Sequence, residues 1–116
     1  MNHMDEKESY CTKIEERLRD LVSQVDEMMW KTSNYARKTR KRFKQSAEMF
    51  RENQKAVTEK VSGIRNASGK SWKELKEGLT KAMGELEKGF ESAVHEFKQS
   101  EADSGVDEPS EQKEEA

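Results

Sequence analysis

The stretch that decides the fold is residues 71–97, which read SWKELKEGLTKAMGELEKGFESAVHEF. From Ile64 onward the sequence repeats every eleven residues: a large aliphatic residue opens each copy, Ala or Gly stands three positions later, and Glu closes the copy. Eleven residues fill three helical turns at about 3.67 residues per turn, which is close to the period of an unstrained α-helix. The repeat therefore predicts a nearly straight amphipathic helix.

The apolar side chains of this predicted helix gather on one face, within an arc of roughly 120°. The opposite face mixes lysine with glutamate throughout. Amphipathic helices that lie on lipid favour Lys and Arg on their polar face, so we favour packing against other helices and keep membrane association as an alternative. The packing residues predicted on this face are Trp72, Leu75, Leu79, Leu86, Phe90 and Phe97.

Toward the N-terminus, apolar residues recur at alternating steps of three and four, which is the spacing of an a/d coiled-coil seam. The seam weakens where Thr32, Ala36 and Thr39 stand at its positions. Trp30, at the edge of this weak stretch, is interpreted as a packing anchor. The residues expected to pack along the rest of the seam are Leu18, Leu21, Val25, Phe43, Phe50, Val57 and Val61.

Two places can interrupt the helices. Near residues 66–70, Gly69 suits a helix C-terminus, and Ser71 with Glu74 forms a capping box that starts a new helix. Residues 32–34 are three poor helix formers in succession, without glycine or proline. Because the apolar phase continues unbroken through residues 64–75, and because residues 32–34 include no residue that bars a helix, both breaks stay open on the sequence alone.

The main prediction is an all-α, elongated coiled-coil hairpin within residues 1–100, formed by a long helix over about 5–67 and a shorter one over about 71–99. If the chain also breaks at 32–34, three segments of similar length give the alternative, a three-helix bundle. A 60-residue helix is about 90 Å long and its shorter partner about 45 Å. Since the hairpin would leave part of the long helix uncovered, we expect a homo-oligomer formed by helix packing.

Residues 101–116 differ in composition from the rest of the chain. They carry seven acidic side chains and one lysine, together with Gly105, Pro109 and a single large aliphatic residue, Val106. Such a segment buries too little apolar surface to offset its ordering entropy. We predict a disordered acidic tail.

The composition also limits the classes of function. Asp, Glu, Lys and Arg make up 40% of the chain, whereas Leu, Ile, Val and Phe number only 17 of 116 residues, too few for a β-sandwich or an α/β enzyme. His3 and His95 lie far apart, and no metal-ligand spacing, phosphate loop or nucleophile motif is visible. We therefore expect no enzyme activity, no cofactor, no metal and no small-molecule substrate.

The sequence features that report on compartment are few. The single cysteine, Cys11, cannot form an internal disulfide, and the longest apolar run has three residues, 28–30. No basic stretch followed by an apolar one marks a secretory signal. We predict a soluble cytoplasmic protein.

The most concentrated local feature is the basic segment 37–44, in a region (31–70) with 12 basic and 3 acidic side chains. It suggests a site for nucleic acid or anionic lipid. At about 100° per residue, its cations are expected to point all round the helix axis. The interpretation favoured on sequence alone is a solvated stretch that pairs with the acidic segment 1–30 of a neighbouring helix or chain. The candidate polyanion-binding residues are Arg37, Lys38, Arg40, Lys41, Arg42 and Lys44.

One resemblance rests on the C-terminal repeat. Its residues are similar to the C-terminal half of a family of small bacterial coiled-coil proteins, some of which are labelled stress-response proteins; they are Trp72, Lys73, Glu74, Leu75, Lys76, Glu77, Gly78, Lys81, Ala82, Glu85, Leu86, Phe90, Ala93 and Phe97. The similarity covers roughly residues 9–99, and the basic middle departs from the mixed charge of the family. The resemblance implies an all-helical cytoplasmic protein without catalytic residues. We thus predict a non-enzymatic coiled-coil structural or interaction protein, linked to the stress response, with polyanion binding as the alternative.

Overall fold

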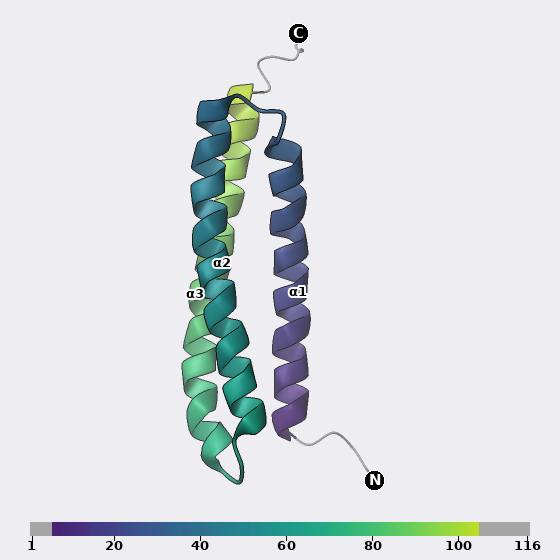
Figure 1. Ribbon diagram of the computed structural model, residues 1–116, viewed down its shortest axis with the longest axis vertical. Helices are drawn as coiled ribbons and strands as arrows, with labels where there is room; N and C mark the ends of the chain where they lie inside the picture. Colours follow the sequence, from purple (N-terminus) through teal and green to yellow (C-terminus); the bar gives the residue numbers. More distant parts are fainter. Residues whose placement is uncertain (1–5, 105–116) are drawn as a thin grey trace.

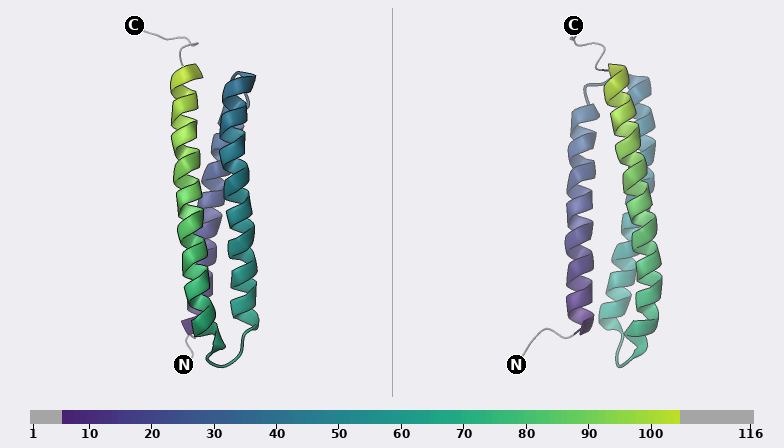
Figure 2. Two further views of the ribbon diagram at one scale, coloured as in Figure 1. Left: turned by 90° about the vertical axis from the view of Figure 1, so that its left-hand side faces the viewer. Right: turned by 180° about the vertical axis from the view of Figure 1, so that it is seen from behind.

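The structure is a computed structural model that describes residues 6–104, with side chains through residue 102. In this range it contains the helices α1 (Glu6–Thr32), α2 (Arg37–Asn66) and α3 (Ser71–Ser104). Each helix runs antiparallel to the one before it, and the bundle measures 61 × 28 × 17 Å (Figure 1 and Figure 2). The predicted all-α class is confirmed.

The arrangement found is the alternative three-helix bundle, and the prediction of one continuous helix over about 5–67 is wrong. The Thr32 hydroxyl donates a hydrogen bond to the Met29 carbonyl at 2.9 Å. The Ser33 hydroxyl donates one to the Trp30 carbonyl at 2.7 Å. Short polar side chains that bond the backbone in this way compete with the helical ladder. Folding back also lets α1 cover the apolar faces of α2 and α3.

The predicted break between α2 and α3 is confirmed at residues 67–70. As α2 ends, the amide of Ala67 donates a hydrogen bond to the carbonyl of Ile64 at 3.1 Å. Gly69 then adopts a φ of 60°, and α3 starts at Ser71. A positive φ does not occur within a right-handed helix, so Gly69 fixes this connection as a turn.

The C-terminal helix is longer than predicted. α3 continues past residue 99 to Ser104, so the prediction of a disordered tail over 101–116 is wrong for its first residues. Between Gly89 and Gly105 the chain contains no glycine or proline, and the fully buried Ser100 holds the preceding turn against the bundle. The remainder of that prediction, residues 105–116, lies outside the described residues.

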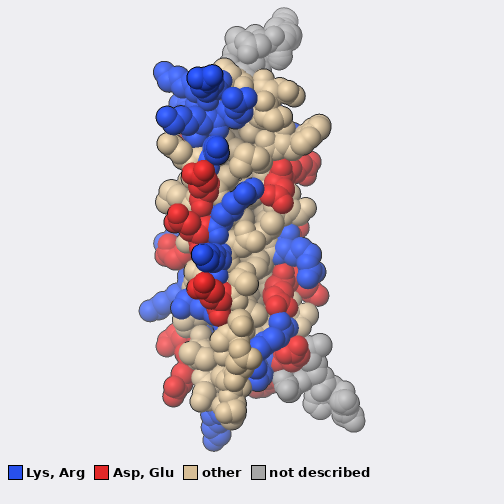
Figure 3. All heavy atoms as spheres, viewed as in Figure 1, with Lys and Arg blue, Asp and Glu red and all other residues tan. Residues whose placement is uncertain are grey.

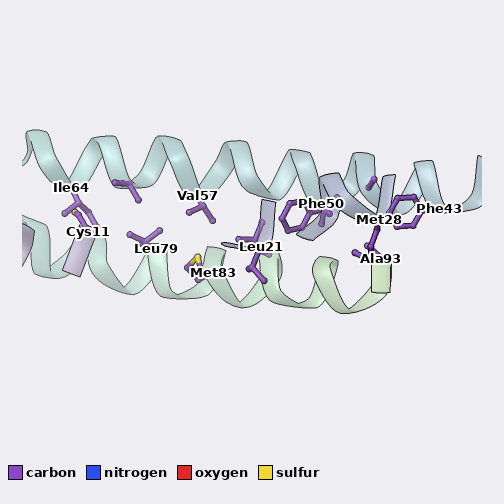
Figure 4. Packing of buried hydrophobic residues seen from close by; sticks show 14 of the residues in the cluster. Cys11, Leu21, Met28, Phe43, Phe50, Val57, Ile64, Leu79, Met83 and Ala93 are labelled. Carbon is purple, nitrogen blue, oxygen red and sulfur yellow. The ribbon is translucent and has the colours of Figure 1, made fainter. Parts of the chain in front are cut away.

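One apolar core runs along the bundle between the three helices. Figure 4 shows Cys11 near Ile64 toward one end and Met28 near Phe43 toward the other. Burying a large apolar side chain stabilises a fold by about 1.5–3 kcal/mol, so this line of contacts supplies most of the stabilisation.

Two aromatic contacts join α2 to α3 within the core. The rings of Phe43 and Phe97 lie 6.1 Å apart between centroids, and those of Phe50 and Phe90 lie 6.4 Å apart. Tilted and edge-to-face ring pairs of this kind contribute about 0.5–1.5 kcal/mol beyond the area they bury. α2 and α3 therefore form a strongly joined pair.

Most of the predicted packing residues lie in the core. Three of them, Leu18, Phe90 and Phe97, are partly buried and pack against it. The buried ones are Leu21, Val25, Phe43, Phe50, Val57, Val61, Trp72, Leu79 and Leu86.

Leu75 does not lie in the core, because 45% of its surface is exposed. The line of buried residues along α3 recurs every seven positions, at Trp72, Leu79, Leu86, Ala93 and Ser100. Seven residues is the period of a heptad coiled coil, so the prediction that Leu75 packs on the core face is wrong. The heptad position that follows Trp72 falls on Lys76, and Leu75 stands one residue outside the seam.

Trp30 is also placed differently from its prediction, since it is 75% exposed. It stands nine residues from the buried Leu21, which is half a turn away from the core face of α1. Trp72 does act as a packing anchor: it is 8% exposed, and its ring lies 6.2 Å from that of Tyr10.

Ion pairs attach α1 to the other helices at the rim of the core. The guanidinium of Arg65 on α2 contacts the carboxylates of Glu15 and Glu8 on α1. Its hydrogen bonds to Glu15 and Glu8 raise the pKa of Arg65. The Arg17 Nε donates a hydrogen bond to the Glu87 carboxylate on α3 at 2.9 Å. α1 is thus held by its apolar seam and by partly exposed charges.

Candidate polyanion-binding surface

The basic segment 37–44 forms the first two turns of α2, at the end of the bundle where α1 and α3 both finish (Figure 1). Its two uncharged residues, Thr39 and Phe43, face the core and are buried, whereas all six of its cations are exposed. Figure 3 shows the resulting group of Lys and Arg side chains, with no acidic side chain among them on the face drawn. The six predicted residues therefore lie together on the surface.

Four of the cations form one line along the helix, because they are spaced by three and four residues. We call this line the basic stripe; it consists of Arg37, Arg40, Lys41 and Lys44. At about 100° per residue, these four span roughly 100° of arc, and Lys38 and Arg42 lie on their flank. The expectation that the cations point all round the axis is wrong, since Thr39 and Phe43 occupy the remaining side.

The basic stripe borders a shallow depression of about 400 Å³, which Gln45 and Glu48 close at its far end. Continuing the same helical line leads to Arg51, whose guanidinium pairs with Asp26 of α1 at 3.4 Å. The charge of α2 is thus balanced from Glu48 onward, whereas the first two turns stay strongly positive.

The helix terminus adds to this positive charge. The first turn of α2 contains no acidic residue, and the N-cap residue Ala36 makes no side-chain capping bond. The exposed amide groups of a helix N-terminus act as about half a positive charge, and each cation placed there costs about 0.3–1 kcal/mol at low salt. Cations at this position oppose the stability of α2 and favour an anion that binds there.

The cations of the segment make few contacts with the described residues. Arg40 donates a hydrogen bond to the Ser33 carbonyl at 3.2 Å, which joins the two ends of the connection. Within residues 6–102, Arg37, Lys38, Lys41 and Lys44 form no ion pair. These four side chains can turn toward a ligand without breaking a contact in that part of the chain.

The acidic side chains of α1 pair elsewhere. Glu8 and Glu15 contact Arg65, and Asp26 contacts Arg51. The ion pairs given for α1 within residues 6–102 therefore do not support pairing between the basic segment and α1 of the same chain. Pairing with a second chain stays a prediction.

An exposed aromatic side chain lies at the same end of the bundle. Trp30 is in the last turn of α1 and is 75% exposed, whereas its residue type predicts a buried packing anchor. Exposed indole rings stack on nucleic-acid bases and also settle at the lipid–water interface. Its spacing from the buried Leu21 would have indicated the outward direction, but only once the core face of α1 was known.

A second depression, at the opposite end of the bundle, is lined by Tyr10 and Trp72. The ammonium of Lys76 already lies over both rings, 5.0 Å from the centroid of Tyr10 and 5.8 Å from that of Trp72. The Tyr10 hydroxyl lies 3.0 Å from the Thr80 hydroxyl. These contacts join α1 to α3 beside the depression, so its aromatic side chains already have partners within the bundle.

Among residues 6–104, no group of three or more His, Cys, Asp or Glu side chains could hold a metal ion. None of the helices in the described part of the chain is both long and apolar enough to cross a membrane.

Comparison with known proteins gives no relative: no family model, no curated protein and no solved structure matches this chain. The resemblance to small bacterial coiled-coil proteins, and the link to the stress response, therefore stay predictions.

Proposed function

We propose that this chain is a non-enzymatic helical interaction protein that binds a phosphate-bearing polyanion through the basic stripe. The observation that carries the proposal is the placement of Arg37, Arg40, Lys41 and Lys44 on one exposed line of α2. The line is about 10 Å long, which suits successive phosphates of a linear polymer or neighbouring headgroups of a lipid surface. Lys38 and Arg42 extend the charge to one side.

The energetics of α2 support the same conclusion. A helix gains stability from acidic residues in its first turn, yet α2 begins with Arg37 and Lys38 and has no acid there. Natural sequences break such a local rule most often where function requires it. The side chains of the basic stripe and the amide groups at the start of α2 then attract the same anion.

The compartment predicted from the sequence suits this function. Cys11, a free thiol on α1, is fully buried in the core. A free thiol in the core is compatible with a reducing compartment. We include a cytoplasmic location in the proposal.

The test is binding of the full chain to three probes that carry the same phosphate chemistry. These are a 20-base-pair DNA duplex, a single-stranded RNA of 20 nucleotides, and vesicles of phosphatidylserine with phosphatidylcholine vesicles as reference. Four phosphate contacts give a slope of about −3.6 for log K against log salt with duplex DNA, so affinity falls about 100-fold between 50 and 200 mM salt. A salt slope near zero contradicts the proposal.

The decisive variant replaces three cations of the basic stripe that make no ion pair in the described range: Arg37→Gln, Lys41→Gln and Lys44→Gln. It should lower the steepness of the salt slope by about three and weaken binding at 50 mM salt at least 30-fold. The control replaces three exposed lysines of α3, Lys73→Gln, Lys81→Gln and Lys98→Gln, and changes net charge by the same amount. Equal losses in the two variants would show that overall charge, and not the stripe, is responsible.

The comparison of probes identifies the source of the phosphates. Binding to either nucleic acid with no retention by phosphatidylserine vesicles assigns the site to nucleic acid. The reverse result, with Trp30 fluorescence shifted to the blue on vesicles, assigns it to an anionic membrane surface. If the chain binds none of the three probes, the proposal is wrong.

A further inference from the structure

The connection between α1 and α2 includes poor helix formers but no residue that bars a helix. It reads Ser33, Asn34, Tyr35, Ala36 and contains neither glycine nor proline. We propose that this connection straightens in a second state and that two copies of the chain then exchange α1, each α1 packing on α2 and α3 of the other copy. The exchange does not depend on polyanion binding.

The spacing of the apolar seam continues through this connection. Thr32 and Thr39 are buried at the ends of α1 and α2, and Phe43 follows in α2. With Ala36 between them, these positions are spaced by four, three and four residues, which is the spacing of a coiled-coil seam. A straightened connection would therefore place the core faces of α1 and α2 on the same side of one continuous helix.

The backbone of Ala36, the last residue of the connection, differs from a helical conformation in ψ alone. Ala36 has φ −56° and ψ 150°, so its φ is already helical and a rotation about ψ alone brings it into the helix. The amide of Arg40 already donates to the Ala36 carbonyl at 2.9 Å, as it would within a helix. Ala36 therefore presents no conformational bar to extending α2 backward into the connection.

The other connection excludes the same change. Gly69 holds φ at 60°, and this turn joins two helices linked by the Phe43–Phe97 and Phe50–Phe90 contacts. Opening this turn would require Gly69 to change from a positive to a negative φ, and it would separate the two aromatic contacts. α2 and α3 therefore stay together in the exchanged state, and only α1 moves.

The contacts of α1 with α2 and α3 can form between two copies as they form within one. The apolar contacts of Leu21 and Val25 with α2 and α3, the Arg17–Glu87 pair and the bonds of Arg65 to α1 all join α1 to those helices and not to the connection. An exchanged dimer keeps this set of contacts and changes only the hinge. Exchange of an identical element is a low-cost route to dimers, because the interface already exists.

The core is weakest beside this connection. The three buried polar residues of the described chain, Thr32, Thr39 and Ser100, come one from each helix and lie at this end of the bundle. The Ser100 hydroxyl has no hydrogen-bond partner within the described residues. Hydroxyls in place of aliphatic side chains reduce the gain from burial, so the bundle opens most readily where α1 meets its hinge.

The exchanged state has a definite shape. α1, the connection and α2 would form one helix of about 90 Å, and two such helices would run antiparallel about an axis at residues 33–36. Each end of the dimer would repeat the bundle seen in the single chain. The partner is therefore a second copy of this chain, and no other protein is required.

The first experiment measures mass and contacts on the unaltered chain. Sedimentation equilibrium from 1 µM to 1 mM should show a monomer–dimer equilibrium. Isotope-labelled and unlabelled chains are then unfolded together, refolded and examined by isotope-filtered NMR. In an exchanged dimer the Tyr10 and Trp72 rings, 6.2 Å apart between centroids in the bundle, give cross-peaks between chains. A dimer in which these cross-peaks arise only within one chain overturns the proposal.

The second experiment changes the hinge. The variant Ser33→Ala/Asn34→Ala raises helix propensity in two hinge positions of each chain and removes the Ser33–Trp30 bond that closes the turn. The dissociation constant of the dimer should fall by about 30-fold. Ser62→Ala/Asn66→Ala, which changes the same residue types at exposed positions of α2 outside the hinge, should leave it unchanged.

A third variant tests the hinge in the opposite direction. Inserting Gly-Ser-Gly between Asn34 and Tyr35 prevents a continuous helix while leaving the closed bundle free to form. This variant should be monomeric at every concentration. If the wild-type chain and the alanine hinge variant both stay monomeric up to 1 mM, or if the insertion leaves the dimer intact, the proposal is wrong.

Discussion

The two connections of the bundle are alike in length and differ in what holds them closed. Residues 67–70 turn because Gly69 takes a φ of 60°, a conformation that belongs to no right-handed helix. Residues 33–36 turn because the side chains of Thr32 and Ser33 bond the last carbonyls of α1 and because α1 gains burial by folding back. The turn at 67–70 is therefore fixed by the backbone conformation of one residue, whereas the turn at 33–36 depends on side-chain hydrogen bonds and tertiary contacts.

The helices joined by these connections differ in the same way. α2 and α3 share the pairs Phe43–Phe97 and Phe50–Phe90. α1 contributes smaller apolar side chains and is secured at the rim by partly exposed ion pairs such as that of Arg17 with Glu87. The molecule therefore behaves as a fixed hairpin, α2–α3, with a third helix attached to it.

The largest effect is expected from breaking the fixed hairpin. Phe50→Ala removes a ring that is 1% exposed and packs against Phe90, so the free energy of unfolding should fall by about 3–5 kcal/mol. Chemical denaturation followed by circular dichroism measures it. Met49→Ala at the neighbouring position, 65% exposed, should change stability by less than about 0.5 kcal/mol. Similar losses in both variants would contradict the placement of the core.

The next effect tests the turn that depends on glycine. A Cβ at Gly69 would meet no atom within 4 Å, so Gly69→Ala costs only the strain of a positive φ, about 1–2 kcal/mol. A Cβ at Gly63, in the helical interior of α2, also meets nothing within 4 Å. There the same change should stabilise by about 0.5–1 kcal/mol. If thermal unfolding shows that both variants raise, or both lower, the stability, then Gly69 does not hold its turn through a positive φ.

A smaller effect is expected from loosening α1 alone. Arg65→Ala removes the contacts with Glu15 and Glu8 that attach α1 to α2, and partly exposed pairs of this kind contribute about 1 kcal/mol at most. Amide hydrogen exchange in the first half of α1 should speed up about two- to fivefold, with little change in α2 and α3. Arg19, exposed on α1, forms no ion pair with the described residues, and Arg19→Ala is the control. A uniform change over all three helices would show that α1 does not open separately.

The same contrast explains which parts of the fold the sequence predicts. The turn at 67–70 could be predicted because Gly69 and Ser71 mark it locally. The turn at 33–36 could not, since a straight helix and a turn share the same apolar phase there and differ by tertiary burial. The sequence misplaces Leu75 because Leu75 opens a copy of the eleven-residue repeat, whereas the heptad seam seen in α3 passes one residue later, at Lys76.

The candidate site was predicted in its residues and not in its geometry. Six cations between positions 37 and 44 are plain in the sequence, but their direction follows only when Thr39 and Phe43 are known to face the core. Trp30 was misplaced for the same reason: its residue type favours burial, and its direction depends on which face of α1 is covered.

The smallest expected effect uses Cys11 to report on the attachment of α1. Burial in the core raises the pKa of the Cys11 thiol above its ordinary value. Because the folded pKa is the higher one, the stability contributed by the neutral thiol is fully present below the unfolded pKa, about 8.5, and is lost as pH rises through the folded pKa. The difference in unfolding free energy between wild type and Cys11→Ala should therefore be larger at pH 7 than at pH 10. Comparing the two chains cancels the titration of lysines. A difference that does not change with pH would mean that the thiol ionises equally well in both states, as it would if α1 left it open to water.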